Sequence, residues 1–529
     1  MVKINGKVIL VIIIWLLIIG LLVYSRFINL GWGLPYPMHP DERNMANAIQ
    51  QLSCKVPISQ LVECFNPHFF AYGQLPLYLG YLVALALKFF NMRLGTPIDF
   101  QEATISLRII SAVASILNAI IIIKIIKFVT KKESYLLSFV SCLLIIFSPY
   151  AIQFAHFGTT ESLLMLLYSL IVYLSMQILE RHTTASVVWM ALVSGLAVAT
   201  KVSSMTFIAV PLITILSSLR SWDRYKNLIK FGILTIIFVA LFSPHNFLNF
   251  KDFISSINYE SEVALGKSLV FYTRQFFNTE PFYFQFTKVF PYVLGWPVFI
   301  LGSLDFLMLS WKDKKINLLR FAFLIYFIPS AMIYAKWSRF MAPILPLITI
   351  FAALFLLRIK IINFITIIIV IIAILPGIAY LSVYQTPDIR FQASDWIYKN
   401  IPNNSYILSE TANVVDIPFS NGTIEQSNNY SVISFNFYDL DVNGQLQQEL
   451  KEHIKKADYI FVPSRRIFIN HSKEKYPLLN KYYEDLFSGK LGFKKIAEFS
   501  SGLNDEQAEE TWTVFDHPVI RIYKRVKSF

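Results

Sequence analysis

Long apolar runs separated by short polar segments occupy the chain from its N-terminus to about residue 384. About 20 consecutive apolar residues are needed for a helix to cross the roughly 30 Å hydrocarbon layer of a bilayer, and the shorter runs require a locally thinner layer. About eleven runs qualify on this basis, near residues 8–28, 103–125, 135–151, 160–179, 185–200, 205–219, 228–243, 289–309, 320–335, 341–357 and 361–384. The pattern predicts an α-helical polytopic membrane protein with about 11 transmembrane helices.

The apolar segment Leu75–Phe90 is interpreted differently, as an amphipathic segment at the external surface. If it crossed the membrane, the lysines of the next loop, Lys124 to Lys132, would lie outside, against the positive-inside rule. With this segment outside, the cytoplasmic loops hold an excess of basic residues equal to the net charge of +13. The basic balance is thus a topology signal and does not require a nucleic-acid partner. We expect a plasma-membrane protein with a cytoplasmic N-terminus.

This topology places three long polar segments outside: a first loop at 29–102, a second loop at 244–288 and a tail. We therefore expect a transmembrane domain at 1–384 and a small extracytoplasmic α/β domain at 385–529. In the tail, periodicity predicts helices and strands. The helices are expected at Asp395–Asn400 and Leu446–Ala457, and the strands at Tyr406–Leu408, Tyr459–Val462 and Val514–Tyr523, the last one broken at Pro518.

Three cysteines are too few for a disulfide scaffold, and no His or Cys cluster has the spacing of a metal site. Cys54 and Cys64 both fall in the first external loop, where pairing requires an oxidising compartment, and the sequence leaves their pairing open. Cys142 falls within a span. The first apolar run lacks a small-residue cleavage pattern, so we expect it to remain as a span rather than to be removed as a signal peptide.

The best candidate for an active site follows the first span, at Tyr36–Asn44. Pro40 suits the first turn of a helix, and apolar residues then recur at helical spacing. Asp41 and Glu42 fall in that first turn, where the positive end of the helix dipole favours ionised carboxylates. An acid here is expected to act as a charged base. The alternative is that both acids only cap a surface helix.

Further ionisable residues are predicted near the same membrane face. Glu161 begins the fourth span, Lys201 lies between the fifth and sixth, and Arg339 between the ninth and tenth. Charges at the edge of the hydrocarbon are costly unless they pair, reach water or act on a substrate. Ordinary helix-end and interfacial roles are the alternative for each.

Other polar residues are weaker candidates. Arg274 and Lys288 lie in the second loop, where a solvated charge is the simpler interpretation. Asp305 is interpreted as an unpaired acid toward the cytoplasmic half of a span and is left out of the site. The external histidines, which are expected to have hydrogen-bonded roles rather than metal-binding ones, are His39, His68, His156 and His245.

The order of these features resembles the GT-C superfamily of membrane glycosyltransferases, in its family 39 and aminoarabinose-transferase-like branch, which includes the protein O-mannosyltransferases. The resemblance spans roughly residues 1 to 380. It is carried by Asp41-Glu42, by the Pro76-Leu77-Tyr78 segment, by Arg108 at the start of the second span, by Glu161, by Gly195-Leu196-Ala197 to Thr200-Lys201, and by Arg339 before Pro343 and Pro346. The Trp-Trp-Asp-Tyr-Gly motif of oligosaccharyltransferases is absent.

The resemblance implies an inverting glycosyltransferase that moves a sugar from a polyprenyl-phosphate donor to a lipid, glycan or protein acceptor outside the membrane. It implies that Asp41 is the catalytic base, with Glu42 and Glu161 as further catalytic candidates. Lys201 and Arg339 are expected to contact the lipid phosphate, and Arg274 and Tyr78 complete the substrate-binding candidates. No cofactor is required, and a divalent metal is possible but not indicated. The rival functions are a transporter or flippase of lipid-linked sugars and a polysaccharide polymerase or ligase.

Overall fold

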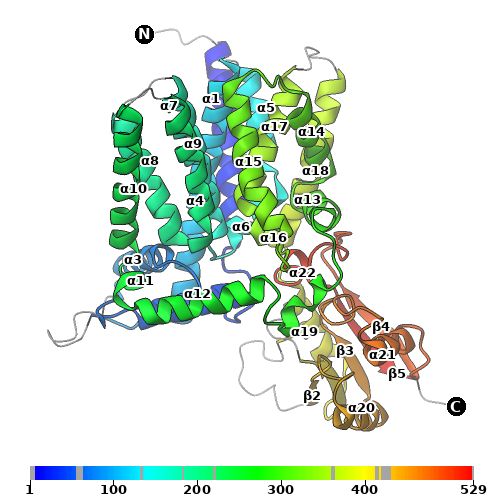
Figure 1. The fold of residues 1–529 in the computed structure, drawn as a ribbon. Helices are drawn as coiled ribbons and strands as arrows, with labels where there is room; N and C mark the ends of the chain where they lie inside the picture. Colours follow the sequence, from blue (N-terminus) through cyan, green and yellow to red (C-terminus); the bar gives the residue numbers. More distant parts are fainter. Residues whose placement is uncertain are drawn as a thin grey trace.

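The computed structural model describes residues 6–54, 63–93, 95–131, 135–180, 184–218, 222–358, 364–411, 416–418 and 430–526. A bundle of apolar helices carries a layer of further helices across one end, and a small α/β unit lies beyond that end (Figure 1). The fold is therefore the predicted helical membrane protein with a small C-terminal sheet.

Each predicted apolar run coincides with a helix or a helix pair of the bundle. The helices are α1 (Gly6–Phe27), α4 (Phe100–Thr130), α5 (Tyr135–Ile146), α6 (Pro149–His156), α7 (Glu161–Glu180), α8 (Thr184–Thr200), η2 (Val202–Ile208), α9 (Ala209–Ser218), α10 (Trp222–Phe242), η4 (Gln285–Val289), α13 (Phe290–Val293), α14 (Trp296–Met308), α15 (Lys314–Met332), α16 (Ser338–Met341), η5 (Ala342–Ile344), α17 (Leu345–Arg358) and α18 (Phe364–Gln385). Sequence hydrophobicity thus located these helices correctly.

Fewer helices than predicted are long and apolar enough to be counted as membrane spans. Six of the described helices are long and apolar enough to cross a membrane, and two bent pairs raise the number to eight. The other three predicted spans correspond to α1, α8 and η2–α9, which stand in the same bundle (Figure 1). Their apolar stretches with described side chains are shorter, at Val11–Phe27, Ala185–Thr200 and Val202–Ser217. Large apolar side chains on the outer helices, such as Leu16, Ile236 and Ile367, are more than half exposed, as lipid contact requires.

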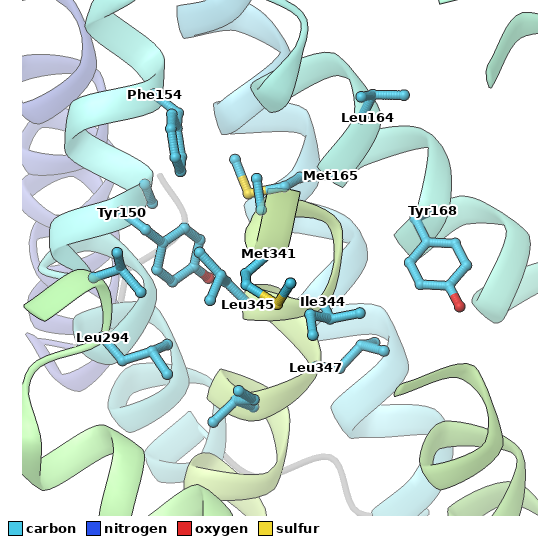
Figure 2. Close-up of a cluster of buried hydrophobic side chains, with 14 of the residues drawn as sticks. Tyr150, Phe154, Leu164, Met165, Tyr168, Leu294, Met341, Ile344, Leu345 and Leu347 are labelled. Carbon is cyan, nitrogen blue, oxygen red and sulfur yellow. The ribbon is translucent and has the colours of Figure 1, made fainter. Parts of the chain in front are cut away.

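A proline bends the third predicted span. The axes of α5 and α6 differ by 53°. Pro149 opens α6, and a proline disfavours a helical conformation in the residue before it, so Ser148 is extended. Gly377 of α18 packs here, since a Cβ on it would lie 1.7 Å from the carbonyl oxygen of Phe147. Figure 2 shows the buried core beside this bend, where Tyr150 of α6 and Met165 of α7 pack near Met341.

The layer across this end contains most of the two long loops that the sequence predicted to lie outside. Its helices are α2 (Pro40–Gln51), α3 (Leu75–Phe90), α11 (His245–Leu248), α12 (Phe250–Ala264) and η3 (Phe271–Phe276). α3, the segment interpreted as a surface helix, lies at the same end of the bundle as α11 and α12 (Figure 1). A disulfide joins Cys54 to Cys64 in the first loop, whereas Cys142 is free and buried. Cys54 and Cys64 are therefore paired, which the sequence alone left open.

The C-terminal unit is a five-stranded sheet with helices. Its elements are α19 (Ile389–Asn400), β1 (Tyr406–Glu410), β2 (Ser431–Phe435), α20 (Gly444–Lys456), β3 (Tyr459–Val462), α21 (Pro477–Phe487), β4 (Phe493–Phe499), α22 (Glu510–Thr513) and β5 (Ile520–Arg525). The strand order is β2-β1-β3-β5-β4. β1 pairs in parallel with β2 and β3, and β5 runs antiparallel to β3 and β4.

The predicted elements of this unit are largely confirmed. β1, α20 and β3 lie where periodicity placed them, and α19 begins earlier, at Ile389. The closing strand is a correction: it begins at Ile520, after Pro518, because a proline cannot donate to a sheet ladder. β2, β4 and α21 were not predicted. β4 carries exposed lysines at the edge of the sheet, so its apolar alternation is weak.

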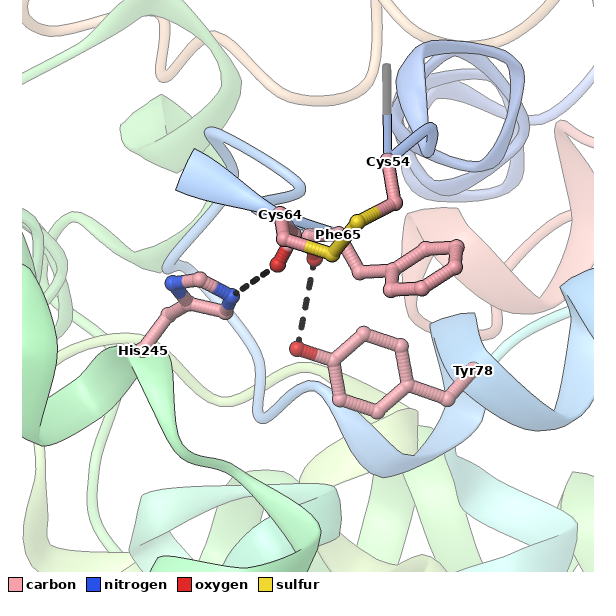
Figure 3. Close-up of a disulfide and its surroundings, with 5 residues drawn as sticks. All are labelled: Cys54, Cys64, Phe65, Tyr78 and His245. Carbon is pink, nitrogen blue, oxygen red and sulfur yellow. Dashed lines mark hydrogen bonds between the residues drawn. A yellow bond between two sulfur atoms is a disulfide. The ribbon is translucent and has the colours of Figure 1, made fainter. Parts of the chain in front are cut away.

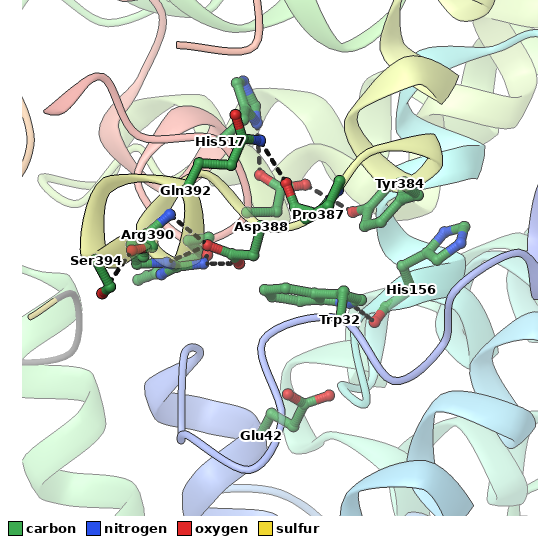
Figure 4. A network of polar contacts seen from close by, with 12 residues as sticks. Trp32, Glu42, His156, Tyr384, Pro387, Asp388, Arg390, Gln392, Ser394 and His517 are labelled. Atoms are coloured by element: carbon green, nitrogen blue, oxygen red, sulfur yellow. Dashed lines mark hydrogen bonds and ion pairs between the residues drawn. The ribbon is translucent and has the colours of Figure 1, made fainter. Parts of the chain in front are cut away.

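Buried polar contacts join the C-terminal unit to the helices. Asp516 accepts hydrogen bonds from the hydroxyls of Tyr380 at 2.7 Å and Tyr384 at 2.6 Å, both on α18. His517 lies between Asp516 and Asp505, with nitrogen to oxygen distances of 2.6 and 2.9 Å. Figure 4 shows Tyr384 and His517 of this network together with Arg390 and Asp388, which form a buried ion pair. The two parts of the molecule are thereby fixed against each other.

Candidate active site at the end of the helix bundle

The first turn of α2 has the structure that the sequence predicted. His39 is the N-cap residue, and its Nδ1 accepts a hydrogen bond from the backbone N–H of Glu42 at 3.5 Å. Pro40 occupies the first helical position, where a missing N–H has no cost. Asp41 and Glu42 follow as the acids of the first turn. Because neighbouring residues of a helix point in different directions, the two carboxylates have different surroundings.

Glu42 is enclosed by protein. Nε and Nη2 of Arg108 donate to its two carboxylate oxygens at 2.7 Å each, and the backbone N–H of Gly158 donates at 2.7 Å. Both side chains are almost fully buried. Gly158 is required for this approach, since a Cβ there would lie 2.7 Å from Glu42 Oε1. Glu42 therefore holds the start of α2 against α4 and the α6–α7 turn.

Asp41 has different partners from Glu42. Its carboxylate forms an ion pair with the guanidinium of Arg339 on α16, and Tyr72 donates a hydrogen bond to it. Burial by itself would raise the pKa of Asp41, but the positive charges of Arg339 and Lys201 and the Tyr72 bond lower this pKa below its usual value. The lowered pKa favours the ionised carboxylate at neutral pH. The role of this carboxylate as a base stays a prediction.

Lys201 and Glu161 form a second pair beside the first. Nζ of Lys201 lies 3.8 Å from Oε1 of Glu161, and both side chains are largely buried. The same Nζ is 4.9 Å from the ring centre of Tyr72 and 5.5 Å from that of Phe340. Tyr72 thus contacts both pairs. The structure brings together Asp41, Glu161, Lys201 and Arg339, which the sequence placed on one membrane face.

A cavity of about 320 Å³ opens at the Asp41–Arg339 pair. The membrane-proximal part contributes residues of α2, the loop before α3, α12 and α16, and the C-terminal unit contributes Arg466, Glu510, Thr511 and Phe515. Glu42 is not among the lining residues. The cavity is closed partly by the C-terminal unit, so this unit helps to form the candidate site.

Sequence reasoning missed several residues of the cavity. Glu260 of α12 lines it, and burial together with the nearby Asp41 raises the pKa of Glu260 above its usual value, although Arg339 and Lys201 oppose this. Tyr72 and Arg466 were also missed. No motif marks any of these positions, because each lies in a polar segment where a charge or a tyrosine is ordinary.

Three weaker candidates have other contacts. Arg274 bonds to the Tyr438 carbonyl and to Asp439 Oδ1 at 3.2 Å, so it ties η3 to the C-terminal unit. The Tyr78 hydroxyl donates to the Phe65 carbonyl at 3.4 Å beside the Cys54–Cys64 disulfide (Figure 3). Nζ of Lys288 donates to Gln507 at 3.4 Å. None of the three lines the cavity in the part of the chain that the structure describes.

Two further expectations concern ion pairs and metals. Asp305 was expected to be unpaired, which is wrong: Arg358 of α17 forms an ion pair with it. A carboxylate inside a span requires such a partner, but sequence does not show which distant cation packs against it. Within the described ranges, no group of three or more His, Cys, Asp or Glu side chains is arranged to hold a metal ion.

Comparison with known proteins gives a family match to part of the chain and a likeness of fold. The family described as dolichyl-phosphate-mannose-protein mannosyltransferase matches residues 82–247, a stretch that contains Arg108, Glu161 and Lys201 but not Asp41 or Arg339. No curated protein matches the chain significantly.

Among solved structures, ArnT from Cupriavidus metallidurans in the apo state is similar over 98% of each chain, with 11% identity and a TM-score of 0.50. The oligosaccharyltransferase from Archaeoglobus fulgidus in the apo form is similar over 89% of this chain and 72% of its own, with 12% identity and a TM-score of 0.51. At these identities the likeness concerns the fold.

Proposed function

We propose that this protein, which has the fold of the GT-C membrane glycosyltransferases, is an inverting glycosyltransferase that uses a polyprenyl-phosphate-linked sugar. The observation that carries the proposal is the Asp41 carboxylate paired with Arg339 in a cavity at the end of the helix bundle. Lys201 does not line this cavity and lies behind Tyr72, which does. A base next to cations at the membrane boundary matches a hydroxyl acceptor and a lipid-phosphate leaving group.

The reaction assigns a role to each group. Asp41 accepts the proton of the acceptor hydroxyl as its oxygen bonds to the anomeric carbon, while the bond from that carbon to the phosphate oxygen breaks. Attack opposite the leaving group inverts the anomeric centre. Arg339 and Lys201 stabilise the negative charge on the departing lipid phosphate. Loss of one such contact is expected to raise the barrier by about 2–4 kcal/mol, by analogy with oxyanion-hole donors.

Donor binding must redistribute the Asp41–Arg339 pair. A guanidinium has five N–H donors, so Arg339 is able to bind a phosphate while it releases Asp41 toward the acceptor. The Arg339 Nε has no hydrogen-bond partner among the described residues, which leaves a donor for this purpose. Glu161 holds Lys201, and Glu42 holds the first turn of α2. We assign both acids positioning roles rather than contact with the reacting atoms.

The reaction is proposed for the extracytoplasmic face, with a lipid, glycan or protein as acceptor. Nucleotide sugars do not cross the bilayer, so an external transferase needs a donor that is already in the membrane. The proposed sidedness is supported by the excess of Lys and Arg in the loops that the positive-inside rule assigns to the cytoplasm.

The test is Asp41→Asn in the purified full-length protein. It should fold, elute as a single species and bind undecaprenyl phosphate, but lose sugar transfer by about 10²–10⁴-fold, because a general base contributes that much. Asp252→Asn is the matched control, since Asp252 is an exposed acid of α12 that does not line the cavity. Retained transfer by Asp41→Asn would refute the proposal.

Release of free polyprenyl phosphate on adding acceptor separates a transferase from a flippase, and the length of the product separates single-sugar transfer from polymerisation.

A further inference from the structure

Two consecutive arginines of the C-terminal unit, Arg465 and Arg466, have different surroundings. Arg465 bonds to the Ala508 carbonyl and donates to Asn470 Oδ1 at 3.0 Å, so it anchors the chain before α22. Arg466 turns toward the cavity and lines it. Its side chain is only 6% exposed.

The buried guanidinium of Arg466 is only partly satisfied by its neighbours. Its Nε lies 2.9 Å from Glu510 Oε1, and its side chain also interacts with Tyr438, but among the described residues neither Nε nor Nη1 makes a hydrogen bond of good geometry. Buried polar groups are nearly always satisfied, and a charged one left without partners is costly. An arginine of this kind in the lining of a cavity is suited to a ligand that supplies a further acceptor.

The guanidinium is held in place by the surrounding contacts. The Ser464 hydroxyl accepts from the backbone N–H of Arg466 at 3.1 Å, and Glu510 also accepts from Asn470. The neighbouring Glu509 accepts from the backbone N–H of Ser338 at 2.9 Å, directly before Arg339. The segment that carries Glu510 is therefore tied to the segment that carries Arg339.

Among the described residues, the cavity lining carries three arginines, Arg43, Arg339 and Arg466, and three acids, Asp41, Glu260 and Glu510. Burial raises the pKa of Glu260 and so favours its neutral form, which favours an anionic ligand beside the arginines. Arg339 is paired with Asp41 and Arg466 with Glu510, and burial raises the pKa of Glu510 above its usual value, against the effect of Arg466. Arg43 also lines the cavity and has no carboxylate partner within the part of the chain described. A planar guanidinium with free N–H groups binds carboxylates and phosphates well.

We propose that Arg466 binds an oxyanion of a substrate, which makes the C-terminal unit part of the substrate site. This inference rests on the proposed glycosyl transfer, which identifies the bound oxyanion as part of a substrate. The oxyanion belongs either to the lipid phosphate of the donor or to an acidic group of the acceptor. Arg466 lies on a unit outside the helix bundle, whereas the cations assigned to the lipid phosphate are at helix ends.

The experiment measures binding without turnover, in the full-length protein in detergent. Inorganic phosphate is the soluble probe and undecaprenyl phosphate is the lipid probe. Arg466→Gln should weaken the binding of inorganic phosphate at least about tenfold, the effect of losing a charged hydrogen-bond donor. Arg521→Gln is the matched control, because Arg521 is an arginine of the same unit that pairs with Glu506 away from the cavity. It should leave phosphate binding within about twofold of the unmodified protein.

The two probes separate the sources of the oxyanion. An equal loss of undecaprenyl phosphate binding assigns Arg466 to the donor phosphate, and an unchanged lipid affinity assigns it to the acceptor. Unchanged phosphate binding in Arg466→Gln, or no phosphate binding by the unmodified protein, overturns the proposal.

A second variant covers a failure of Arg466→Gln to fold. Glu510→Gln removes the same ion pair but keeps the guanidinium, so phosphate should bind several-fold more tightly. Weaker or unchanged binding in Glu510→Gln overturns the proposal as well. Sugar transfer by Asp41→Asn tests the proposed reaction separately, since phosphate binding at Arg466 requires no turnover.

Discussion

Asp41 in the first turn of α2 and Arg339 on α16 form an ion pair although 298 positions separate them in the chain. The pair joins the first external loop to the segment between two apolar helices. It also keeps the carboxylate ionised despite its burial. The proposed base, Asp41, and the proposed phosphate-binding residue, Arg339, are therefore paired with each other before substrate binds.

The acid limb of the pH profile should depend on Arg339. In the unmodified protein Asp41 has a lowered pKa, so kcat/KM should stay high until the pH falls below the usual range of an aspartate. Arg339→Gln removes the main positive charge and leaves burial, so the limb should move to higher pH. Arg43→Gln is the control, since Arg43 lines the cavity without pairing with Asp41. An unmoved limb in Arg339→Gln would show that Asp41 is not the titrating base.

Glu42 should matter for stability rather than for chemistry. Glu42→Ala leaves Arg108 buried without its carboxylate, and breaking a buried pair costs about 3–5 kcal/mol. The midpoint of thermal unfolding in detergent should fall accordingly. Glu484→Ala, which removes the acid of an exposed pair with Lys473, should cost about 0–1 kcal/mol. Equal midpoints for the two variants would contradict the positioning role.

His517 should make the stability of the protein decrease at alkaline pH. Burial alone would lower its pKa, but Asp505 and Asp516 raise it from 6.5 to about 10. A pKa that is higher in the folded state gives stability that is complete below 6.5 and is lost as the pH rises toward 10.

The unfolding midpoint should therefore fall between pH 6.5 and 10. In His517→Gln, which cannot titrate, this part of the fall should be absent and the midpoint at pH 6.5 should be lower. The same slope in both proteins would show that His517 is not protonated in the fold.

Thiol labelling should reveal the sidedness of the first loop. Cys54 and Cys64 are joined, and the free Cys142 is buried, so a membrane-impermeant maleimide should not label oxidised vesicles. After reduction, right-side-out vesicles should be labelled and inverted vesicles should not. The variant Cys54→Ser/Cys64→Ser should remain unlabelled in both. Labelling only in inverted vesicles would place the candidate site on the cytosolic side.

The sequence alone determined the features that depend on local chemistry. Runs of apolar residues located the helices of the bundle, because burial in lipid requires a minimum length of apolar helix. Pro40 and the two acids after it predicted the start of α2, since proline and carboxylates both favour a first turn. The predicted topology alone placed Asp41, Glu161, Lys201 and Arg339 on the same face of the membrane, and helix ends on one face must lie near one plane.

Only the tertiary structure decided how these residues pair. The sequence does not show how the surroundings of Asp41 and Glu42 differ. In the structure Asp41 lines a cavity, whereas Glu42 is buried against Arg108. Asp305 has a partner on another helix, and Arg466 reaches the cavity from a separate unit. Such contacts join residues far apart in the chain, and they depend on side-chain packing between elements rather than on the periodicity within any one of them.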